Sequence, residues 1–432
     1  SGTIYTAFGP EDGDVYAVEA WAEDQAGNRS DWTALGISTL QVAQDGDPTI
    51  ASVTPNGGTF SNGVTITISG SNFGTGPTVV SWDDFESGVD GNILGDPVVG
   101  YAWDINQHGH DADTPPAQYD NARAYSGNLS ARVSWKEPGY NGYSQNSFGW
   151  VNKGPYSELY ISWMRYMETS SQDYVGKNIK QVYLFGSASD GTYSDLNQII
   201  TAMVPAGGNY WAFYTQNRPT QQINYGGVGY TSSLNKWSRW ECWYKFNQPY
   251  SASNGEVKIW YENAAKQDLD GLVLGEIAGS NATTDIRIGN MYQGYGSETY
   301  ARAFYDDIYI ATSQARIEIG NASTFAACSN RQILVPSQWS NGSIQAPMRT
   351  TSFSIGETVY VFVVDSSGTA SPGFPVIVGG ISSPVIPSAS IDFSLEDDTG
   401  YEQILVADSR PGGSSIDADM TAQWRLKSGS TW

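Results

Sequence analysis

Short runs in which apolar and polar residues alternate recur along the whole chain, and each run predicts a β-strand with one buried face. Residues 64–69, for example, read Val-Thr-Ile-Thr-Ile-Ser, so that every second position is apolar. Segments rich in Gly and Asn separate these runs and supply turns. The composition agrees, because 48 Gly, 27 Tyr and 15 Trp accompany only 16% charged residues. The sequence therefore predicts an all-β protein, and its 432 residues suffice for two to four domains.

The longest set of predicted strands spans residues 82–311. Its two ends, 82–88 and 304–310, are typical of the first and last strands of one β-sandwich. Residues 236–247 read Lys-Trp-Ser-Arg-Trp-Glu-Cys-Trp-Tyr-Lys-Phe-Asn. They are similar to the W-x-x-x-E-x-x-x-K-x-N strand of laminin-G-like and polysaccharide-lyase-like sandwiches, with residues 255–261 as the usual hairpin partner. The resemblance implies a concanavalin A-like jelly roll over residues 82–311.

A second domain is predicted from two pieces that flank the jelly roll. Residues 48–58 read Pro-Thr-Ile-Ala-Ser-Val-Thr-Pro-Asn-Gly-Gly and resemble the opening of a TIG (IPT) immunoglobulin-like domain. The later strands of that family resemble four runs far downstream, at residues 315–321, 331–336, 358–365 and 375–378. We therefore expect residues 47–81 and 312–379 to form one TIG-like domain with the jelly roll inserted at a loop, where insertions are best tolerated.

The two ends of the chain read as two halves of a third domain. Residues 15–24 alternate strictly, and residues 25–30 resemble the D-x-A-G-N-x-S turn late in fibronectin type III or bacterial immunoglobulin-like domains. Residues 388–432 contain three runs that read as early strands of such a domain. The sequence therefore predicts that residues 1–44 are its C-terminal half and residues 388–432 its N-terminal half. Together the halves have about the size of an immunoglobulin-like domain.

Three arrangements of these halves remain open. They can close within one chain as a permuted domain, or pair between chains in a head-to-tail fibre. The chain can also be one period of a longer tandem array. The fibre or array is the first functional hypothesis, with neighbouring copies of the protein as partners. Its predicted assembly interface consists of Ile4, Tyr16, Val18, Trp21, Ile404, Val406, Trp424 and Leu426.

Charge narrows the possible partners. The formal net charge of −23 argues against nucleic-acid binding, because no basic patch is available for phosphates. No apolar run approaches the length of a membrane span, and Ser1 does not begin a signal peptide, so we expect a mature or excised chain. The composition fits an extracellular or cell-surface protein that repels its neighbours except at specific contacts.

Acidic residues at the ends of the jelly roll are candidates for a calcium site. Glu86, Asp306 and Asp307 resemble the first-strand and last-strand positions that hold a structural Ca²⁺ in many carbohydrate-binding jelly rolls. Carboxylate oxygens suit this hard cation, and the alternative is solvated acids at strand ends. His108 and His110 stand beside two Asp in a Gly/Pro-rich loop, where a plain polar loop is favoured over a transition-metal site.

Aromatic residues on the predicted jelly-roll strands offer glycan binding, since sugar rings stack on Trp and Tyr while polar neighbours bind the hydroxyls. Cross-strand packing uses the same residue types and is the alternative. Lys180 is a further candidate for a sugar contact. Six residues are predicted to contact a glycan, namely Arg165, Tyr214, Gln216, Trp237, Arg239 and Trp243.

The chain contains none of the catalytic motifs that the fold would suggest. Neither the Y-F-K-A-G-x-Y-x-Q and Q-x-H motifs of polysaccharide lyases nor the E-x-D-x-x-E pair of glycosidases occurs. We therefore expect a structural or adhesive protein that displays a lectin-like domain. A secreted, monomeric polysaccharide-binding module or polysaccharide lyase is the alternative.

Two cysteines are too few for a disulfide framework. Cys242 alternates with Trp240, Tyr244 and Phe246 along one strand, which favours a buried free thiol. A bridge between Cys242 and Cys328 is the alternative in an oxidising compartment.

Overall fold

The computed structural model is all-β, as the alternating runs predict. Within the described part of the chain its regular helix is limited to the short 3₁₀ turn η5 (Phe325–Ala327). The chain divides into two compact units. We call residues 75–316 with 364–368 the jelly-roll unit, and the remaining residues the immunoglobulin-like unit. The structure describes residues 16–23, 33–34, 46–56, 58–104, 115–136, 143–168, 178–187, 193–204, 210–216, 223–229, 234–249, 252–275, 282–293, 300–380 and 421–428.

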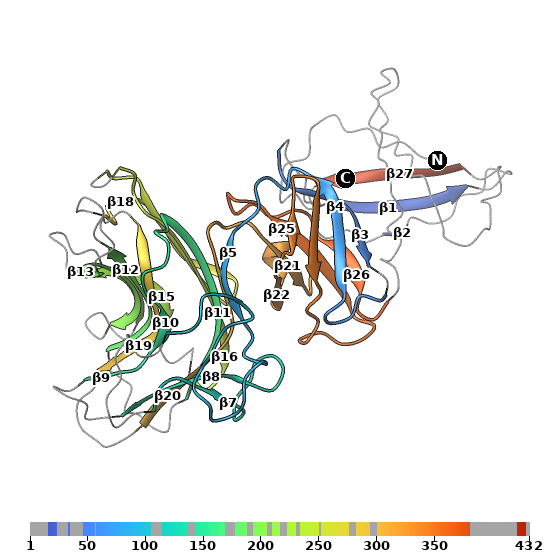
Figure 1. Cartoon of the computed structure of the whole chain (residues 1–432). Coiled ribbons are helices and arrows are strands. Elements are labelled where there is room, and N and C mark those ends of the chain that lie inside the picture. Colours follow the sequence, from blue (N-terminus) through green and yellow to red (C-terminus); the bar gives the residue numbers. More distant parts are fainter. Residues whose placement is uncertain are drawn as a thin grey trace. The chain divides into compact units, whose positions relative to one another are not determined.

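The first sheet of the jelly-roll unit has nine strands. β5 (Val79–Asp83) pairs with β20 (Tyr300–Ala311), and Ile308 lies opposite Asp83. The two ends of the predicted sandwich are therefore neighbouring strands (Figure 1). The order is β18 (Ala264–Leu272), β17 (Gly255–Tyr261), β16 (Trp237–Lys245), β11 (Glu158–Glu168), β20, β5 and β6 (Val99–Gly100), with β8 (Ser130–Lys136) on β20 and β7 (Gln118–Asp120) on β8.

The second sheet of the jelly-roll unit has seven strands and forms the other layer of the sandwich (Figure 1). Its central strand pair, β12 with β19, carries a register shift between Lys180 and Val182. The order is β10 (Phe148–Trp150), β19 (Thr283–Gln293), β12 (Asn178–Ser187), β13 (Tyr193–Val204), β14 (Tyr210–Gln216) and β15 (Ile223–Gly229), with β9 (Tyr143–Gln145) also on β19.

The core of the jelly-roll unit follows from strand alternation. Trp240, Cys242 and Tyr244 of β16 are buried in it, while the residues between them point to the other face. The rings of Trp163 and Trp240 stack with their centroids 6.5 Å apart. Burial of such aromatic side chains supplies most of the stabilisation of a sandwich. Cys242 is free as well as buried, as its alternation with aromatic residues indicates.

The immunoglobulin-like unit contains two four-stranded sheets around one core. Ile66 and Ile68 of β4 contact the same core as Ile317 and Val361, so residues from both flanks of the jelly roll pack together. The sheets have the orders β23 (Gln338–Trp339), β24 (Ser343–Pro347), β4 (Thr65–Ser71), β3 (Thr49–Pro55) and β22 (Arg331–Leu334), β21 (Arg316–Gly320), β25 (Thr358–Val364), β26 (Phe374–Ile377).

The boundary between the two units differs from the one expected at residue 82. β5 begins at Val79 and pairs with β20, so residues 79–81 belong to the large sheet of the jelly-roll unit. The reason is pairing: Ser81 lies opposite Ile310, and a strand is added to a sheet as a whole.

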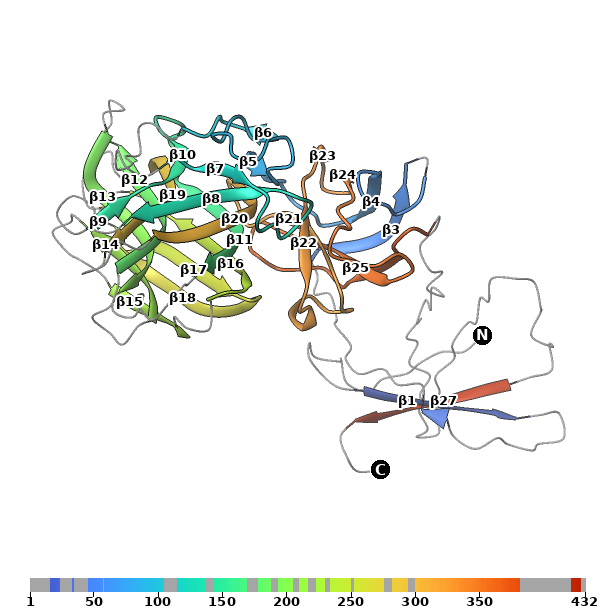
Figure 2. The same cartoon turned by 90° about the horizontal axis from the view of Figure 1, so that it is seen from below.

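The strands near the two ends of the chain form a small sheet of their own. β1 (Tyr16–Glu23) pairs antiparallel with β27 (Thr421–Ser428) along all eight residues, and with β2 (Thr33–Ala34) on its other side. Both views show β1 and β27 side by side (Figures 1 and 2). The remaining residues of the predicted terminal halves lie outside the described residues.

Candidate functional site

Four side chains on β12 and β19 form a row on the face of the seven-stranded sheet that lies away from the core. Val182 and Leu184 are core residues, so Tyr183 and Phe185 point to the opposite face. The Lys180 Nζ lies 5.0 Å from the Tyr183 ring centroid, and the Tyr183 and Phe185 rings stack at 5.3 Å. The Arg287 Cζ lies 4.2 Å from the Phe185 centroid. We call these four residues the cation–aromatic row.

A β-bulge places Lys180 in this row. In the pairing with β13, the register shift between Lys180 and Val182 leaves Gln181 as an extra residue. The Trp163 Nε1 donates a hydrogen bond of 3.3 Å to the Gln181 Oε1, so Gln181 faces the core. Without the extra residue, Lys180 would have the orientation of Val182 and face the core. The bulge therefore brings a lysine to the face that Tyr183 occupies.

Burial dominates the electrostatics of the row. Lys180 is only 2% exposed, and burial lowers the pKa of its amine to about 7. An amine with this pKa is close to half-protonated at neutral pH, so it can bind an anion or accept a proton. Burial raises the pKa of Asp285, which lies opposite Phe185, while a 2.6 Å hydrogen bond from Thr284 and the charge of Arg287 lower it.

The strand register aligns two of the predicted glycan contacts with this row across the sheet. Tyr183 lies opposite Ile200, which lies opposite Tyr214. Phe185 likewise lies opposite Gln198, which lies opposite Gln216. Residues directly opposite each other share a face. In the register of the sheet, Tyr214 and Gln216 therefore align with Tyr183 and Phe185 across β13.

Arg165 does not belong to this face or to any outward face. It lies opposite Ser238 of β16 and Tyr305 of β20. It stands two residues from each of the core residues Trp163 and Met167, so it shares their face of the strand. It is 1% exposed and donates to the Met167 sulfur at 2.7 Å. Strand alternation therefore places Arg165 in the interior of the sandwich, where it is not available to contact a glycan.

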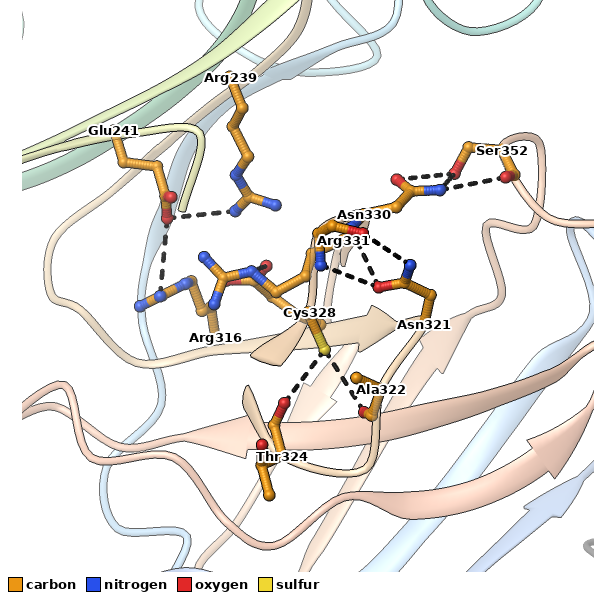
Figure 3. Close-up of polar contacts among 12 residues, drawn as sticks. Arg239, Glu241, Arg316, Asn321, Ala322, Thr324, Cys328, Asn330, Arg331 and Ser352 are labelled. Carbon is orange, nitrogen blue, oxygen red and sulfur yellow. Dashed lines mark hydrogen bonds and ion pairs between the residues drawn. The ribbon is translucent and has the colours of Figure 1, made fainter. Parts of the chain in front are cut away.

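The other predicted glycan contacts lie on the outward face of the nine-stranded sheet, and there the charges are paired. Glu241 is 1% exposed and accepts a hydrogen bond from the Tyr160 hydroxyl. Its Oε1 lies 3.2 Å from the Arg239 Nη2 and 3.7 Å from the Nη2 of Arg316, the last residue of this unit before the chain leaves it (Figure 3). We call these four residues the ion-pair network.

Two tryptophans flank the ion-pair network on the same strand. The Trp243 Nε1 donates a 2.8 Å hydrogen bond to Glu158, and Lys245 and Lys258 place their ammonium groups 5.8 and 5.6 Å from its ring. Trp237 packs edge-on against Tyr166 at 5.8 Å. Trp237, Arg239 and Trp243 therefore share a face, and Arg239 and Trp243 are buried there by their neighbours.

The predicted calcium ligands bind a loop through its backbone. The Asp306 Oδ2 accepts from the backbone N–H groups of Tyr125 and Ser126 at 2.8 and 3.0 Å. The Asp307 Oδ1 accepts from the Ser126 hydroxyl at 2.8 Å, and the Glu86 Oε1 accepts from the N–H groups of residues 128 and 129. Burial, and then the charge of Asp307, raise the pKa of Asp306 well above its usual value.

In the part of the chain that the structure describes, no group of three or more His, Cys, Asp or Glu side chains could hold a metal ion. Calcium binding by Glu86, Asp306 and Asp307 stays a prediction, and His108 and His110 lie outside the described residues.

In the immunoglobulin-like unit, Cys328 is buried and free. Its sulfur lies 3.4 Å from the carbonyl oxygens of Ala322 and Thr324 (Figure 3), and burial raises the pKa of its thiol. A thiol with a raised pKa is a poor nucleophile, so Cys328 acts as a small buried side chain.

Of the predicted assembly residues, the structure brings Val18 opposite Leu426. Tyr16 lies opposite Ser428, and Trp21 opposite Gln423. Trp424 lies opposite Ala20, whereas Ile4, Ile404 and Val406 lie outside the described residues.

Among the described residues, no helix is long and apolar enough to span a membrane.

Sequence reasoning missed Tyr183, Phe185 and Arg287. The signal was present for the two rings, because they alternate with Val182 and Leu184 in a strand that the sequence predicts. Arg287 carried no comparable signal, since its place opposite Tyr183 follows from the pairing of β12 with a strand a hundred residues away.

Comparison with known proteins supports the outline of this architecture. The profile of the IPT/TIG domain family matches residues 48–89, in agreement with the TIG-like opening predicted at Pro48. The comparison with curated protein sequences gives no match. The TIG match covers a small part of the chain, so it identifies one domain and not the whole protein.

Three solved structures illustrate what the chain is similar to. An endo-β-1,4-glucuronan lyase from the fungus Trichoderma reesei is 13% identical, with a TM-score of 0.36, over 49% of this chain and 94% of the lyase. The alginate lyase Aly36B is 13% identical, with a TM-score of 0.35, over 54% and 96%. A Bacillus licheniformis β-glucanase is 14% identical, with a TM-score of 0.30, over 55% and 98%. Likenesses this distant give no basis for assigning an activity.

Proposed function

We propose that the jelly-roll unit is an extracellular polysaccharide-binding module and that the cation–aromatic row is part of its binding face. The observation that carries the proposal is the contiguity of the row, in which an ammonium, two stacked rings and a guanidinium follow one another at centroid distances of 5.0, 5.3 and 4.2 Å. Aromatic faces bind sugar rings, and cations bind their carboxylates.

An acidic polysaccharide is the ligand class that this row fits best. The chain has 45 acidic and only 22 basic residues, whereas the row and its neighbour Asp285 together hold two basic groups and one carboxyl group. In a buried setting the attraction of the two cations for a carboxylate is stronger than in water. Tyr214 and Gln216 align with the row across β13 in the register of the sheet.

Calorimetry with a panel of polymers tests this proposal. A polyuronate is expected to bind the wild-type protein more tightly than a neutral β-glucan of equal length, and added salt is expected to reduce that preference. The double variant Lys180→Met/Arg287→Gln is expected to lose the preference. Lys258→Met, which removes a partly exposed lysine from the other sheet, is the matched control. Equal affinity of wild type and double variant for the polyuronate would exclude the row as the site.

A second candidate function, polysaccharide cleavage by β-elimination, is favoured by the place of the Lys180 amine, which lies 5.0 Å from the Tyr183 ring and whose pKa is lowered by burial to about 7. A neutral amine can remove the proton next to a uronate carboxylate, after which a carbon–carbon double bond forms and the glycosidic bond breaks. The leaving glycosidic oxygen takes the proton from the ammonium that the amine has become. Arg287 could neutralise the carboxylate during this step. New unsaturated ends, read by ultraviolet absorbance, would reveal the reaction. Lys180→Arg should abolish it while preserving the positive charge.

The predicted head-to-tail fibre and the predicted calcium ion remain proposals beside this one. Neither is required for a sugar to bind the cation–aromatic row. An intact-mass measurement under native conditions addresses the fibre, and titration with calcium during thermal unfolding addresses the ion.

A further inference from the structure

The ladder between β1 and β27 joins strands from opposite ends of the chain. Its register is continuous from the pair Tyr16–Ser428 to the pair Glu23–Thr421, without a bulge. Residue types match across it, because Val18 stands opposite Leu426 and Glu19 opposite Arg425. Cross-strand pairs of this kind specify register, since a slip by one residue would place apolar residues opposite charged ones.

Among the described strands, β27 stands at the edge of its sheet. In the sheet order β2-β1-β27, it pairs with β1 alone among the described strands. By comparison, β20 of the jelly-roll unit pairs with β11, β5 and β8. The ladder between β1 and β27 can therefore separate without disrupting any other described pairing.

The linker between β26 and β27 is long enough for β27 to come from the same chain or from a second copy of it. Residues 378–420 separate β26 from β27, and a segment of that length can reach on the order of 100 Å when extended. The main-chain hydrogen bonds of the ladder are the same whether β27 comes from the same chain or from another. The balance between the two forms is then set by loop-closure entropy against protein concentration, with a crossover near millimolar for linked modules.

We infer that the β1–β27 ladder is an exchangeable joint, in which β27 of one copy pairs with β1 of a second copy of this chain. Each copy then offers a β1 at one contact and a β27 at another. Such a contact is heterologous, so it closes reciprocally into a dimer or continues head-to-tail into an open chain. The high negative charge of the protein opposes other contacts between copies, which leaves the ladder as the specific one.

Cysteine pairs placed across the register test the exchange. Ala22 stands opposite Ala422, so the variants Ala22→Cys and Ala422→Cys are made as two separate full-length proteins that differ by a mass tag. They are mixed at high concentration, incubated and oxidised. A disulfide-bonded heterodimer is expected, with a yield that rises with protein concentration. Wild type in parallel shows any product of Cys242 and Cys328, both of which are buried.

Two matched variants make the result decisive. Ala17→Cys mixed with Ala422→Cys places the thiols five residues apart along the ladder, about 17 Å, which a disulfide cannot bridge. Its heterodimer yield is expected to be lower on the order of tenfold. The double variant Ala22→Cys/Ala422→Cys, oxidised at high dilution, is expected to form an intramolecular bridge. A bridge in this double variant without a heterodimer overturns the exchange, and failure of both overturns the ladder itself.

Discussion

The two faces of the jelly-roll unit that lie outside its core both carry buried charges, but they stabilise those charges differently. On the nine-stranded sheet, the Glu241 carboxylate lies between two guanidinium groups and a tyrosine hydroxyl. On the seven-stranded sheet, Lys180 and Arg287 lie over aromatic rings, and burial lowers the pKa of the lysine. The face of the nine-stranded sheet therefore resembles a structural ion-pair network. On the face of the seven-stranded sheet, burial of the Lys180 ammonium lowers the stability of the folded protein.

This difference separates residues that hold the fold from residues that are available for chemistry. A buried charge with complementary partners contributes to structure, and removing one partner is costly. A buried cation with a lowered pKa destabilises the folded protein, and such costs concentrate at functional sites. Lys180, Tyr183 and Phe185 are 2%, 3% and 1% exposed, so they are as buried as Arg239 and Glu241. It is the cost of burying the Lys180 amine, and not exposure, that favours the cation–aromatic row as the binding face.

The largest expected effect comes from breaking the ion-pair network. Glu241→Gln is expected to lower the free energy of unfolding of the jelly-roll unit by about 3–5 kcal/mol, because Arg239 and Arg316 stay buried without their carboxylate. Urea denaturation followed by tryptophan fluorescence measures this change. Glu256→Gln, at the exposed pair with Lys245, is the control and should change the free energy by less than about 1 kcal/mol. Equal small effects of both substitutions would show that the network is not structural.

A smaller effect of opposite sign is expected from Lys180→Met. The folded-state pKa of about 7 lies below the usual 10.5, so folding favours the neutral amine. The cost of Lys180 is fully present below pH 7 and disappears as the pH rises toward 10.5. The variant should therefore be more stable below pH 7 by about 2–4 kcal/mol and should lack this part of the pH dependence.

Unfolding curves at several pH values test this prediction. Lys258→Met is the control because Lys258 is partly exposed on the other sheet, and it should leave the pH dependence of wild type intact. If Lys180→Met keeps the wild-type slope between pH 7 and 10.5, the amine is not destabilised by burial.

Strand alternation was enough to predict the fold class and much of the jelly-roll core. The burial of Cys242 beside Trp240 follows from it. The pairing of β5 with β20 agrees with residues 82–88 and 304–310 as the first and last strands of one sandwich. The same rule places Arg165 with Trp163 in the interior, although the sequence analysis assigned Arg165 to a sugar. Local periodicity therefore specifies which residues share a face more reliably than it specifies their role.

The candidate site was less predictable because it depends on contacts distant in sequence. The bulge at Gln181 that orients Lys180 leaves no mark in the alternation, and the pKa of Lys180 falls only because other elements bury it. Arg239 and Glu241 do point outward, as predicted, but neighbouring side chains cover and pair them. Sequence alone could identify an outward face and could not tell whether that face is covered.

A moderate effect on binding is expected from Arg287→Gln. The substitution removes one of two cations from the cation–aromatic row, and the affinity for a polyuronate should fall about tenfold. The salt dependence of binding should weaken as well, because one fewer charge contributes. Calorimetry at two ionic strengths measures both quantities, and binding to a neutral glucan is the internal control. An equal loss for the neutral polymer would mean that Arg287 positions the rings instead of pairing with a carboxylate.

The smallest effect is expected from Trp243→Phe, which tests the face that carries three of the six predicted glycan contacts. Burial raises the pKa of Glu158 and the hydrogen bond from Trp243 lowers it, so losing this bond should cost about 1 kcal/mol of unfolding free energy. The Phe ring preserves most of the packing between Lys245 and Lys258, and affinity for the polyuronate should not change. Urea denaturation and calorimetry on the same variant separate the two roles. A loss of affinity without a loss of stability would move the binding face to the nine-stranded sheet, because only a direct sugar contact would need the indole there.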